Sequence, residues 1–179
     1  MNIPNIITLV RLLATPVIVW VILSGELTAA FYLFIAAGVS DALDGFIAKR
    51  FNAQTKIGAY LDPIADKVLL VAIYVAMGAG ELLPVWLVIL VVSRDFLIIG
   101  GALLLYTLDY ELDIKPIWTS KVNTFVQIGL AGIVLAAEAY QWQELSFYIF
   151  VLCAVVACTT IISGTGYLIT WAKQVAAEG

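Results

Sequence analysis

The sequence predicts an all-α integral membrane protein with six transmembrane helices, and three observations support this fold class. Hydrophobic residues make up 63% of the 179 residues, charged residues make up only 12%, and mean hydropathy is +1.05. The apolar residues also form runs near the ~20 residues that cross ~30 Å of hydrocarbon. Because these runs lack the alternation of strands, we expect a helical bundle in a single domain, residues 1–179.

The expected spans follow one another with short connections, at residues 6–24, 27–48, 61–79, 82–108, 120–139 and 145–172. Near the start of the chain, Asn5, Thr8 and Arg11 recur every three residues. This polar stripe predicts an N-terminal amphipathic helix at the membrane interface, with an irregular lead-in as the alternative. Cys153 and Cys158 lie five residues apart in the last span, where we expect packing rather than a disulfide or zinc site.

Basic residues lie mainly on one side of the predicted bundle. The connections around residues 24–26, 78–81 and 138–144 contain no Lys or Arg. The opposite side holds Arg11, Lys49, Arg50, Lys56, Lys115, Lys121 and Lys173. The positive-inside rule therefore places both termini in the cytoplasm, and we expect a bacterial inner membrane. No basic surface suggests nucleic acid, and the lack of His excludes imidazole base catalysis.

Four aspartates gather within residues 40–67 of this apolar chain. Asp41 and Asp44 share a face at the end of the second span, and Asp62 and Asp66 share a face of the third. Because the connection between these spans is short, the two faces should oppose each other. Such carboxylates repel by up to about 4 kcal/mol and need cations. Hard oxygen ligands favour Mg²⁺, Mn²⁺ or Ca²⁺, and a two-metal site fits.

Small residues accompany the aspartates on the same two helix faces. Gly45 and Ala48 follow Asp44 at helical spacing, and Gly58 precedes Asp62 by four residues. They leave room for a flat or phosphorylated group to approach the backbone beside the metals. The alternative is that they only allow the helices to pack closely.

The stretch DALDGFIAKRFNAQTKIGAYLDPIAD, residues 41–66, resembles the signature of the CDP-alcohol phosphotransferases, D-x₂-D-G-x₂-A-R-x₈-G-x₃-D-x₃-D. Members of this family are integral membrane enzymes with six transmembrane helices. Every position and spacing matches except one, because Lys49, followed by Arg50, stands at the signature arginine. Lysine still supplies positive charge to a pyrophosphate but lacks the bidentate fork of a guanidinium.

The resemblance implies a role for each residue of the motif. Two ions of Mg²⁺ or Mn²⁺ would be bound by Asp41, Asp44, Asp62 and Asp66. Asp66 would also be the catalytic base that deprotonates the acceptor hydroxyl. The CDP donor would contact Asp41, Gly45, Ala48, Lys49 and Gly58. The resemblance further implies a homodimer.

The second half of the chain places Arg94, Asp95 and Lys121 inside the predicted spans. Arg94 and Asp95 lie well inside the fourth span, where buried charges usually serve function. Arg94 is a candidate for binding an acceptor phosphate, and a structural pair with Asp95 is the alternative. Lys121 lies one turn inside the fifth span, where it either contacts a phosphate or extends to the interface.

Two stretches of this half resemble the cardiolipin synthases of the same family. These are SRD at residues 93–95 and KPIWTSKVNT at residues 115–124, whereas IPN at residues 3–5 is shared with phosphatidylglycerophosphate synthases. The resemblance implies transfer of the phosphatidyl group from CDP-diacylglycerol to phosphatidylglycerol, giving cardiolipin and CMP. Glycerol 3-phosphate is the alternative acceptor.

Two other classes of membrane protein also use acidic residues. Intramembrane prenyltransferases hold Mg²⁺ and a pyrophosphate between facing aspartate motifs, but they resemble a larger bundle and lack the G-x₂-A spacing after Asp44. Divalent-cation transporters place acidic residues along a path through the membrane. The four aspartates here gather at the cytoplasmic edge instead, which favours the transferase.

Overall fold

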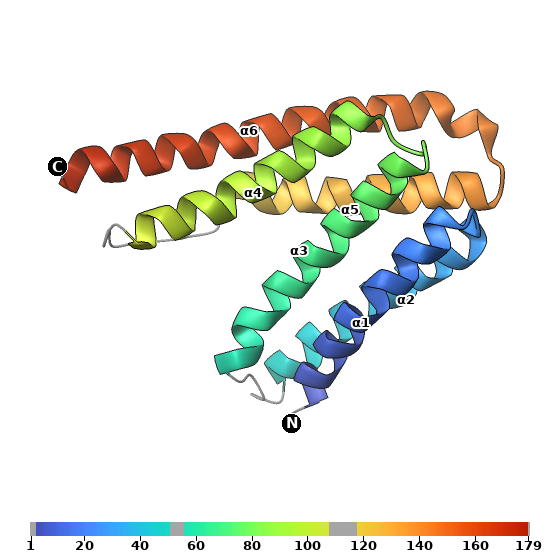
Figure 1. The fold of residues 1–179 in the computed structure, drawn as a ribbon, viewed down its shortest axis with the longest axis horizontal. Helices are drawn as coiled ribbons and strands as arrows, with labels where there is room; N and C mark the ends of the chain where they lie inside the picture. Colours follow the sequence, from blue (N-terminus) through green and yellow to red (C-terminus); the bar gives the residue numbers. More distant parts are fainter. Residues whose placement is uncertain (1–2, 51–55, 108–117, 179) are drawn as a thin grey trace. The chain divides into compact units, whose positions relative to one another are not determined.

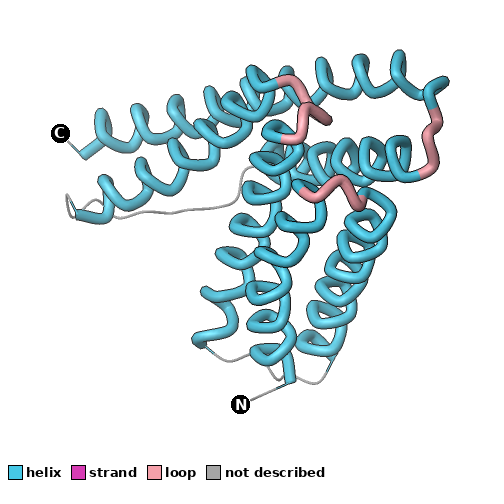
Figure 2. Tube along the Cα trace, turned by 45° about the vertical axis from the view of Figure 1, so that its right-hand side comes forward, coloured by secondary structure: helices cyan, strands magenta, loops and turns pink. Residues whose placement is uncertain are grey.

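The computed structural model describes residues 3–50, 56–107 and 118–178 of the chain. Side chains within these ranges are described except at 3–8, 42, 44–50, 56–64, 106, 174–175 and 177–178. The described elements are α1 (Ile3–Leu23), α2 (Leu27–Arg50), α3 (Lys56–Ala79), α4 (Val85–Thr107), α5 (Trp118–Ala139), the 3-10 turn η1 (Gln143–Leu145) and α6 (Ser146–Glu178) (Figures 1 and 2). The all-α prediction is confirmed for these residues, and each predicted span overlaps one α-helix.

The N-terminal polar stripe and the first apolar run belong to the same helix. Helix α1 continues without interruption from Ile3 to Leu23, with Pro16 inside it. Arg11 therefore lies in the middle of α1 and not in a preceding helix. A separate interfacial helix is not confirmed.

Three helices end in the same backbone motif. Their terminating residues, Gly25, Glu81 and Gln141, have φ angles of 78°, 59° and 55°. In each case the following N–H donates to the carbonyl five residues earlier, from Glu26 to Val21 (3.2 Å), Leu82 to Met77 (2.8 Å) and Trp142 to Ala137 (2.8 Å). This is the Schellman helix end, which satisfies carbonyls at the helix terminus and turns the chain sharply. Helices α1 and α2 are consequently joined by a tight antiparallel turn (Figure 1).

The helices form two compact units. The first contains residues 1–85 and 131–145, and within it α1 packs against both α2 and α3. Its buried core includes Ile18 and Ile22 from α1, Phe34 from α2, and Tyr74 from α3. Because α1 contacts both helices that carry the aspartate motif, it can place a side chain between them. The single-domain assignment stays a prediction.

Aromatic side chains gather in the first unit where α2 begins and α5 ends. The hydroxyl oxygens of Tyr32 and Tyr140 lie 2.9 Å apart, and the ring of Tyr140 stacks on that of Trp142 at a centroid distance of 5.2 Å. Thr28 also donates a hydrogen bond from Oγ1 to the carbonyl of Ala139, at 3.4 Å. Such tyrosine and tryptophan clusters are typical of a membrane–water interface.

The second unit contains residues 86–130 and 146–179, which include α4, the first part of α5, and α6. Leu87 and Val91 of α4 are buried in its core, together with Val156 of α6. Helices α4 and α6 approach closely at Gly101, because a Cβ atom there would lie 2.2 Å from the Trp171 ring. This core also buries polar side chains, which are described below with the candidate site.

The exposed surface is apolar along much of the described helices. Val85–Leu105, Trp118–Ala139 and Gln143–Lys173 are long and apolar enough to cross a membrane, while Leu9–Leu23 and Leu27–Asp41 are shorter apolar stretches. Large side chains at Trp20, Phe96, Phe125 and Phe150 are between 66% and 78% exposed, as expected for contact with lipid. Three candidate spans thus support a membrane protein, and the count of six is not confirmed.

The two cysteines behave as the sequence predicts. Cys153 is buried, Cys158 is exposed, and both are free thiols. They form no disulfide and contribute to the packing and surface of α6.

Candidate active site

The aspartate motif lies on two helices of the first unit. Helix α2 runs through Asp41 and Asp44 to Arg50, and α3 carries Asp62 and Asp66 from its second turn onward. The helical spacing inferred for both faces is therefore confirmed at the level of the backbone. The side chains of Asp44, Gly45, Ala48, Lys49, Gly58 and Asp62 lie outside those that the structure describes.

Asp41 and Asp66 are the motif aspartates whose side chains the structure describes, and both contact the guanidinium of Arg11. Arg11 of α1 places Nη1 2.6 Å from Oδ1 of Asp41, and the same nitrogen contacts Oδ1 of Asp66. The first and last aspartates of the motif, 25 residues apart in the sequence, therefore both contact Arg11, and the convergence of all four aspartates stays a prediction. Arg11 is only 4% exposed, whereas the Asp41 and Asp66 side chains are 47% and 46% exposed.

Arg11 is a site residue that the sequence reasoning did not identify. The sequence pattern predicts Arg11 as part of an interfacial stripe and as a cytoplasmic positive charge. The relevant signal is that Arg11 is the one charged residue in the sequence of α1, since a buried guanidinium requires an anionic partner. Thr15, one turn later on α1, is also buried, and its Oγ1 donates a hydrogen bond to the carbonyl of Arg11 at 3.0 Å.

The carboxylate oxygens of Asp41 and Asp66 are the type of ligand atom that binds divalent cations. The carboxylate oxygens of Asp41 and Asp66 contact the same nitrogen of Arg11, and both carboxylates are accessible to solvent. Oxygen ligands of this type suit Mg²⁺ or Mn²⁺. Among residues with described side chains, no group of three acidic, Cys or His residues gathers at one point. Asp44 and Asp62 lie on the same two helices, at spacings of three and four residues from Asp41 and Asp66, and a site of four carboxylates stays a prediction.

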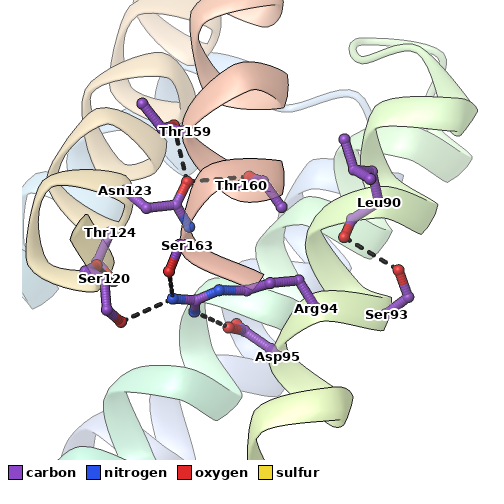
Figure 3. Close-up of polar contacts among 10 residues, drawn as sticks. All are labelled: Leu90, Ser93, Arg94, Asp95, Ser120, Asn123, Thr124, Thr159, Thr160 and Ser163. Carbon is purple, nitrogen blue, oxygen red and sulfur yellow. Dashed lines mark hydrogen bonds and ion pairs between the residues drawn. The ribbon is translucent and has the colours of Figure 1, made fainter. Parts of the chain in front are cut away.

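The second unit buries a polar cluster around Arg94 (Figure 3). Arg94 is 4% exposed and donates from Nη1 to Oδ1 of Asp95, at 2.6 Å. Its Nη2 donates to Oγ of Ser120 on α5, at 2.7 Å, and to Oγ of Ser163 on α6. The guanidinium carbon also lies 5.9 Å from the centre of the Tyr167 ring. Arg94 thus connects α4, α5 and α6 through its own hydrogen bonds.

These contacts agree with the structural alternative for Arg94. The Arg94–Asp95 pair forms as that alternative expected, and both terminal guanidinium nitrogens already have protein partners. Lys121 lies next to Ser120 in α5, but its side chain is exposed, and it is Ser120 that reaches Arg94.

A second buried polar contact lies on the neighbouring turn of the same helices. Asn123 of α5 is fully buried, and its Oδ1 accepts hydrogen bonds from Thr159 and Thr160 of α6 at 2.9 and 3.0 Å (Figure 3). Among the described residues, its Nδ2 has no hydrogen-bond partner. Thr160 and Ser163 were not predicted as site residues, although the polar letters in CTTIISGTG interrupt an apolar run.

The fold and these clusters define a helical, membrane-associated protein with an aspartate motif on two consecutive helices, α2 and α3, which both pack against α1. A model of the CDP-alcohol phosphatidyltransferase family matches residues 1–173. The chain belongs to the CDP-alcohol phosphatidyltransferase family.

Curated relatives carry the names of two activities within this family. A chloroplastic CDP-diacylglycerol–glycerol-3-phosphate 3-phosphatidyltransferase 1 of Oryza sativa is 38% identical, with 93% of this chain and 56% of that protein covered. A cardiolipin synthase (CMP-forming) of Rattus norvegicus is 34% identical, with 93% and 60% covered. A CDP-diacylglycerol–glycerol-3-phosphate 3-phosphatidyltransferase of Bacillus subtilis is 31% identical, with 93% of both chains covered. The chain therefore spans 56–60% of the length of the first two relatives and nearly all of the third.

Proposed function

We propose that the protein is a divalent-metal-dependent phosphatidyltransferase of phospholipid biosynthesis. Its donor is CDP-diacylglycerol, its favoured acceptor is phosphatidylglycerol, and its products are cardiolipin and CMP. The observation that carries this proposal is the convergence of Asp41 and Asp66 within the signature motif of the family. The names of the relatives support phospholipid synthesis, and they include both acceptor classes.

The proposed reaction forms one P–O bond and breaks another. The acceptor hydroxyl oxygen attacks the phosphatidyl phosphorus of CDP-diacylglycerol, its proton passes to the carboxylate of Asp66, and CMP leaves with the electrons of the broken bond. Asp41, Asp44, Asp62 and Asp66 would hold two ions of Mg²⁺ or Mn²⁺. Those ions would supply electrostatic stabilisation of the charge on the pyrophosphate and on departing CMP. A carboxylate that is half exposed, as Asp66 is, can exchange its proton with water after each turnover.

The donor contacts in this proposal come from the motif. Gly45, Ala48 and Gly58 leave space for CDP beside the aspartates, and Asp41 also contacts the donor. Lys49 supplies the positive charge that an arginine supplies in the family signature. We propose that Arg94 and Lys121 contribute to binding the acceptor phosphate. Because Arg94 already contacts Asp95, Ser120 and Ser163, a phosphate there would have to join or displace those partners.

The proposed location is a bacterial inner membrane, with both termini and the aspartate site on the cytoplasmic side. The distribution of Lys and Arg supports this orientation. The substrates suit it, because both lipids lie in the membrane while CMP is released to water. The proposal also includes a homodimer, which the apolar exposed helix faces permit. The family membership gives no support to a prenyltransferase or a cation transporter.

Two acceptors compete within this proposal. The SRD and KPIWTSKVNT stretches favour phosphatidylglycerol, since the donor chemistry shared by both reactions does not require them. Both acceptors carry one phosphate, so charge alone does not separate them. The glycerol 3-phosphate reaction is the second candidate, and the names of the Oryza sativa and Bacillus subtilis relatives favour it.

The acceptor is tested by supplying each candidate separately. Purified protein in micelles would be incubated with CDP-diacylglycerol, Mg²⁺ or Mn²⁺, and either phosphatidylglycerol or glycerol 3-phosphate. Mass spectrometry of the lipids is expected to show cardiolipin from the first mixture. Phosphatidylglycerophosphate from the second mixture, with no cardiolipin from the first, would replace the favoured acceptor by the second candidate.

A further inference from the structure

Arg11 is a buried cation that connects the two helices of the aspartate motif. It lies on α1, is 4% exposed, and uses one nitrogen, Nη1, to contact an oxygen of both Asp41 and Asp66. The three charges come from α1, α2 and α3, so they meet only when the first unit is folded. Neither the signature motif nor the roles proposed above include this arginine.

The charge of Arg11 stabilises the carboxylates in a protein without bound metal. Two carboxylates that reach the same point repel each other strongly, and a guanidinium between them turns that repulsion into attraction. Burial of Arg11 in turn requires those anions, because an unpaired charge in an apolar core is costly. Without metal, the two carboxylates therefore need the charge of Arg11 to stay close together, and Arg11 needs the two carboxylates to stay buried.

We propose that Arg11 is the resident counter-ion of the aspartate site, which pairs with Asp41 and Asp66 until a divalent ion takes over their carboxylate oxygens. This inference rests on the proposed metal-binding function of the aspartates. A divalent ion needs the same oxygens that Nη1 now contacts. A guanidinium does not lose its proton at physiological pH, so its positive charge stays in the site and opposes the incoming ion. Arg11 thus stabilises the metal-free fold and weakens metal affinity.

The substitution Arg11→Gln separates these two effects. The full-length variant in detergent micelles is expected to bind Mn²⁺ about tenfold or more tightly than the unsubstituted protein, because one repelling charge is gone. Its thermal unfolding temperature without metal should fall, and added Mn²⁺ should raise that temperature by more than in the unsubstituted protein. Mn²⁺ binding is measured from the electron paramagnetic resonance signal of the free ion, which does not depend on enzymatic turnover.

Two matched variants on α1 control for charge and for packing. Arg11→Lys keeps the positive charge and is expected to keep Mn²⁺ affinity closer to that of the unsubstituted protein than Arg11→Gln does. Thr15→Val removes a buried hydroxyl one turn away, at nearly constant volume and without a change of charge. It is expected to leave Mn²⁺ affinity unchanged, so an effect confined to Arg11→Gln supports the counter-ion role.

A second measurement does not require a substituted protein to fold. In the ¹⁵N-labelled protein, the side-chain signal of Arg11 is expected to shift when Mg²⁺ is added, because the ion takes over the carboxylate oxygens that Nη1 contacts. Two results would overturn the inference. One is Mn²⁺ binding by Arg11→Gln that is equal to or weaker than that of the unsubstituted protein. The other is an Arg11 signal that does not shift when Mg²⁺ is added. No Mn²⁺ binding by the unsubstituted protein would instead overturn the proposed metal function itself.

Discussion

At the scale of single residues, the aspartates of the motif have different proposed roles, because Asp66 is proposed as the catalytic base as well as a metal ligand. Asp41 and Asp66 contact the same guanidinium nitrogen, yet they lie on different helices and at opposite ends of the motif. If all four aspartates hold metal while Asp66 also accepts the proton, removing one charge should have different kinetic consequences at different positions. Substitution by asparagine keeps size and polarity and removes only the charge.

We predict that Asp62→Asn weakens metal and donor binding, and that Asp66→Asn mainly lowers the rate. Loss of a general base typically costs about 10²–10⁴-fold in kcat. The comparison requires the donor KM and kcat of each variant, measured at saturating metal. Equal losses of donor binding in both variants would reduce Asp66 to a metal ligand.

Lys49 gives a second prediction at this scale. The substitution Lys49→Arg restores the residue of the family signature at a position one residue after Ala48. We expect it to retain activity with an equal or lower donor KM, because a guanidinium contacts a pyrophosphate with two parallel hydrogen bonds. Steady-state kinetics on CDP-diacylglycerol measures this directly. An inactive Lys49→Arg protein would contradict the role inferred for position 49 from the family signature.

At the scale of helices, Arg94 connects α4, α5 and α6 and is also the proposed phosphate ligand. The substitution Asp95→Asn leaves a buried guanidinium without its carboxylate, and we expect it to lower the free energy of unfolding by about 3–5 kcal/mol. The double substitution Arg94→Met, Asp95→Leu removes both charges and should recover most of that loss. Denaturation in detergent micelles measures the three proteins side by side.

The double variant also separates structure from binding. If Arg94 contributes to the acceptor site, the acceptor KM should rise even where stability is restored. Lys121→Gln, at an exposed position, should raise the acceptor KM without changing stability. An unchanged acceptor KM in the double variant would leave Arg94 with a purely structural role.

Sequence reasoning located the helices and the aspartate faces because both depend on local patterns. Long apolar runs fix the helices, and spacings of three and four residues fix which aspartates share a face. The sequence pattern predicts Arg11 in an interfacial helix and not in the site, because spacing along one helix does not say which other helices pack against it. The same limit applies to Ser163, whose contact with Arg94 joins residues 69 apart in the sequence.

At the scale of the whole molecule, the orientation in the membrane decides which compartment would supply the proposed metal and receive the proposed product CMP. Basic residues lie near the motif, and the connections expected on the opposite side contain none. The cluster formed by Tyr32, Tyr140 and Trp142 lies beside one of these connections, as an interfacial anchor would. These features favour a site that faces the cytoplasm.

Residue 54, which lies outside the described residues, tests this orientation. We predict that Gln54→Cys, in a protein whose two native cysteines are replaced by alanine, reacts with an impermeant thiol reagent only from the cytoplasmic side. Labelling of intact cells and of inverted vesicles distinguishes the two sides. Reaction in intact cells alone would reverse the orientation.

The central claim is metal-dependent phosphatidyl transfer from CDP-diacylglycerol, and its most direct test is the release of CMP. Purified protein with CDP-diacylglycerol, phosphatidylglycerol and Mg²⁺ or Mn²⁺ is expected to release one CMP for each cardiolipin formed. A chelator should abolish both products, and Asp41→Asn should reduce both by about 10²-fold or more. Undiminished CMP release in the presence of the chelator, or none in any mixture of donor, metal and either acceptor, would contradict the account.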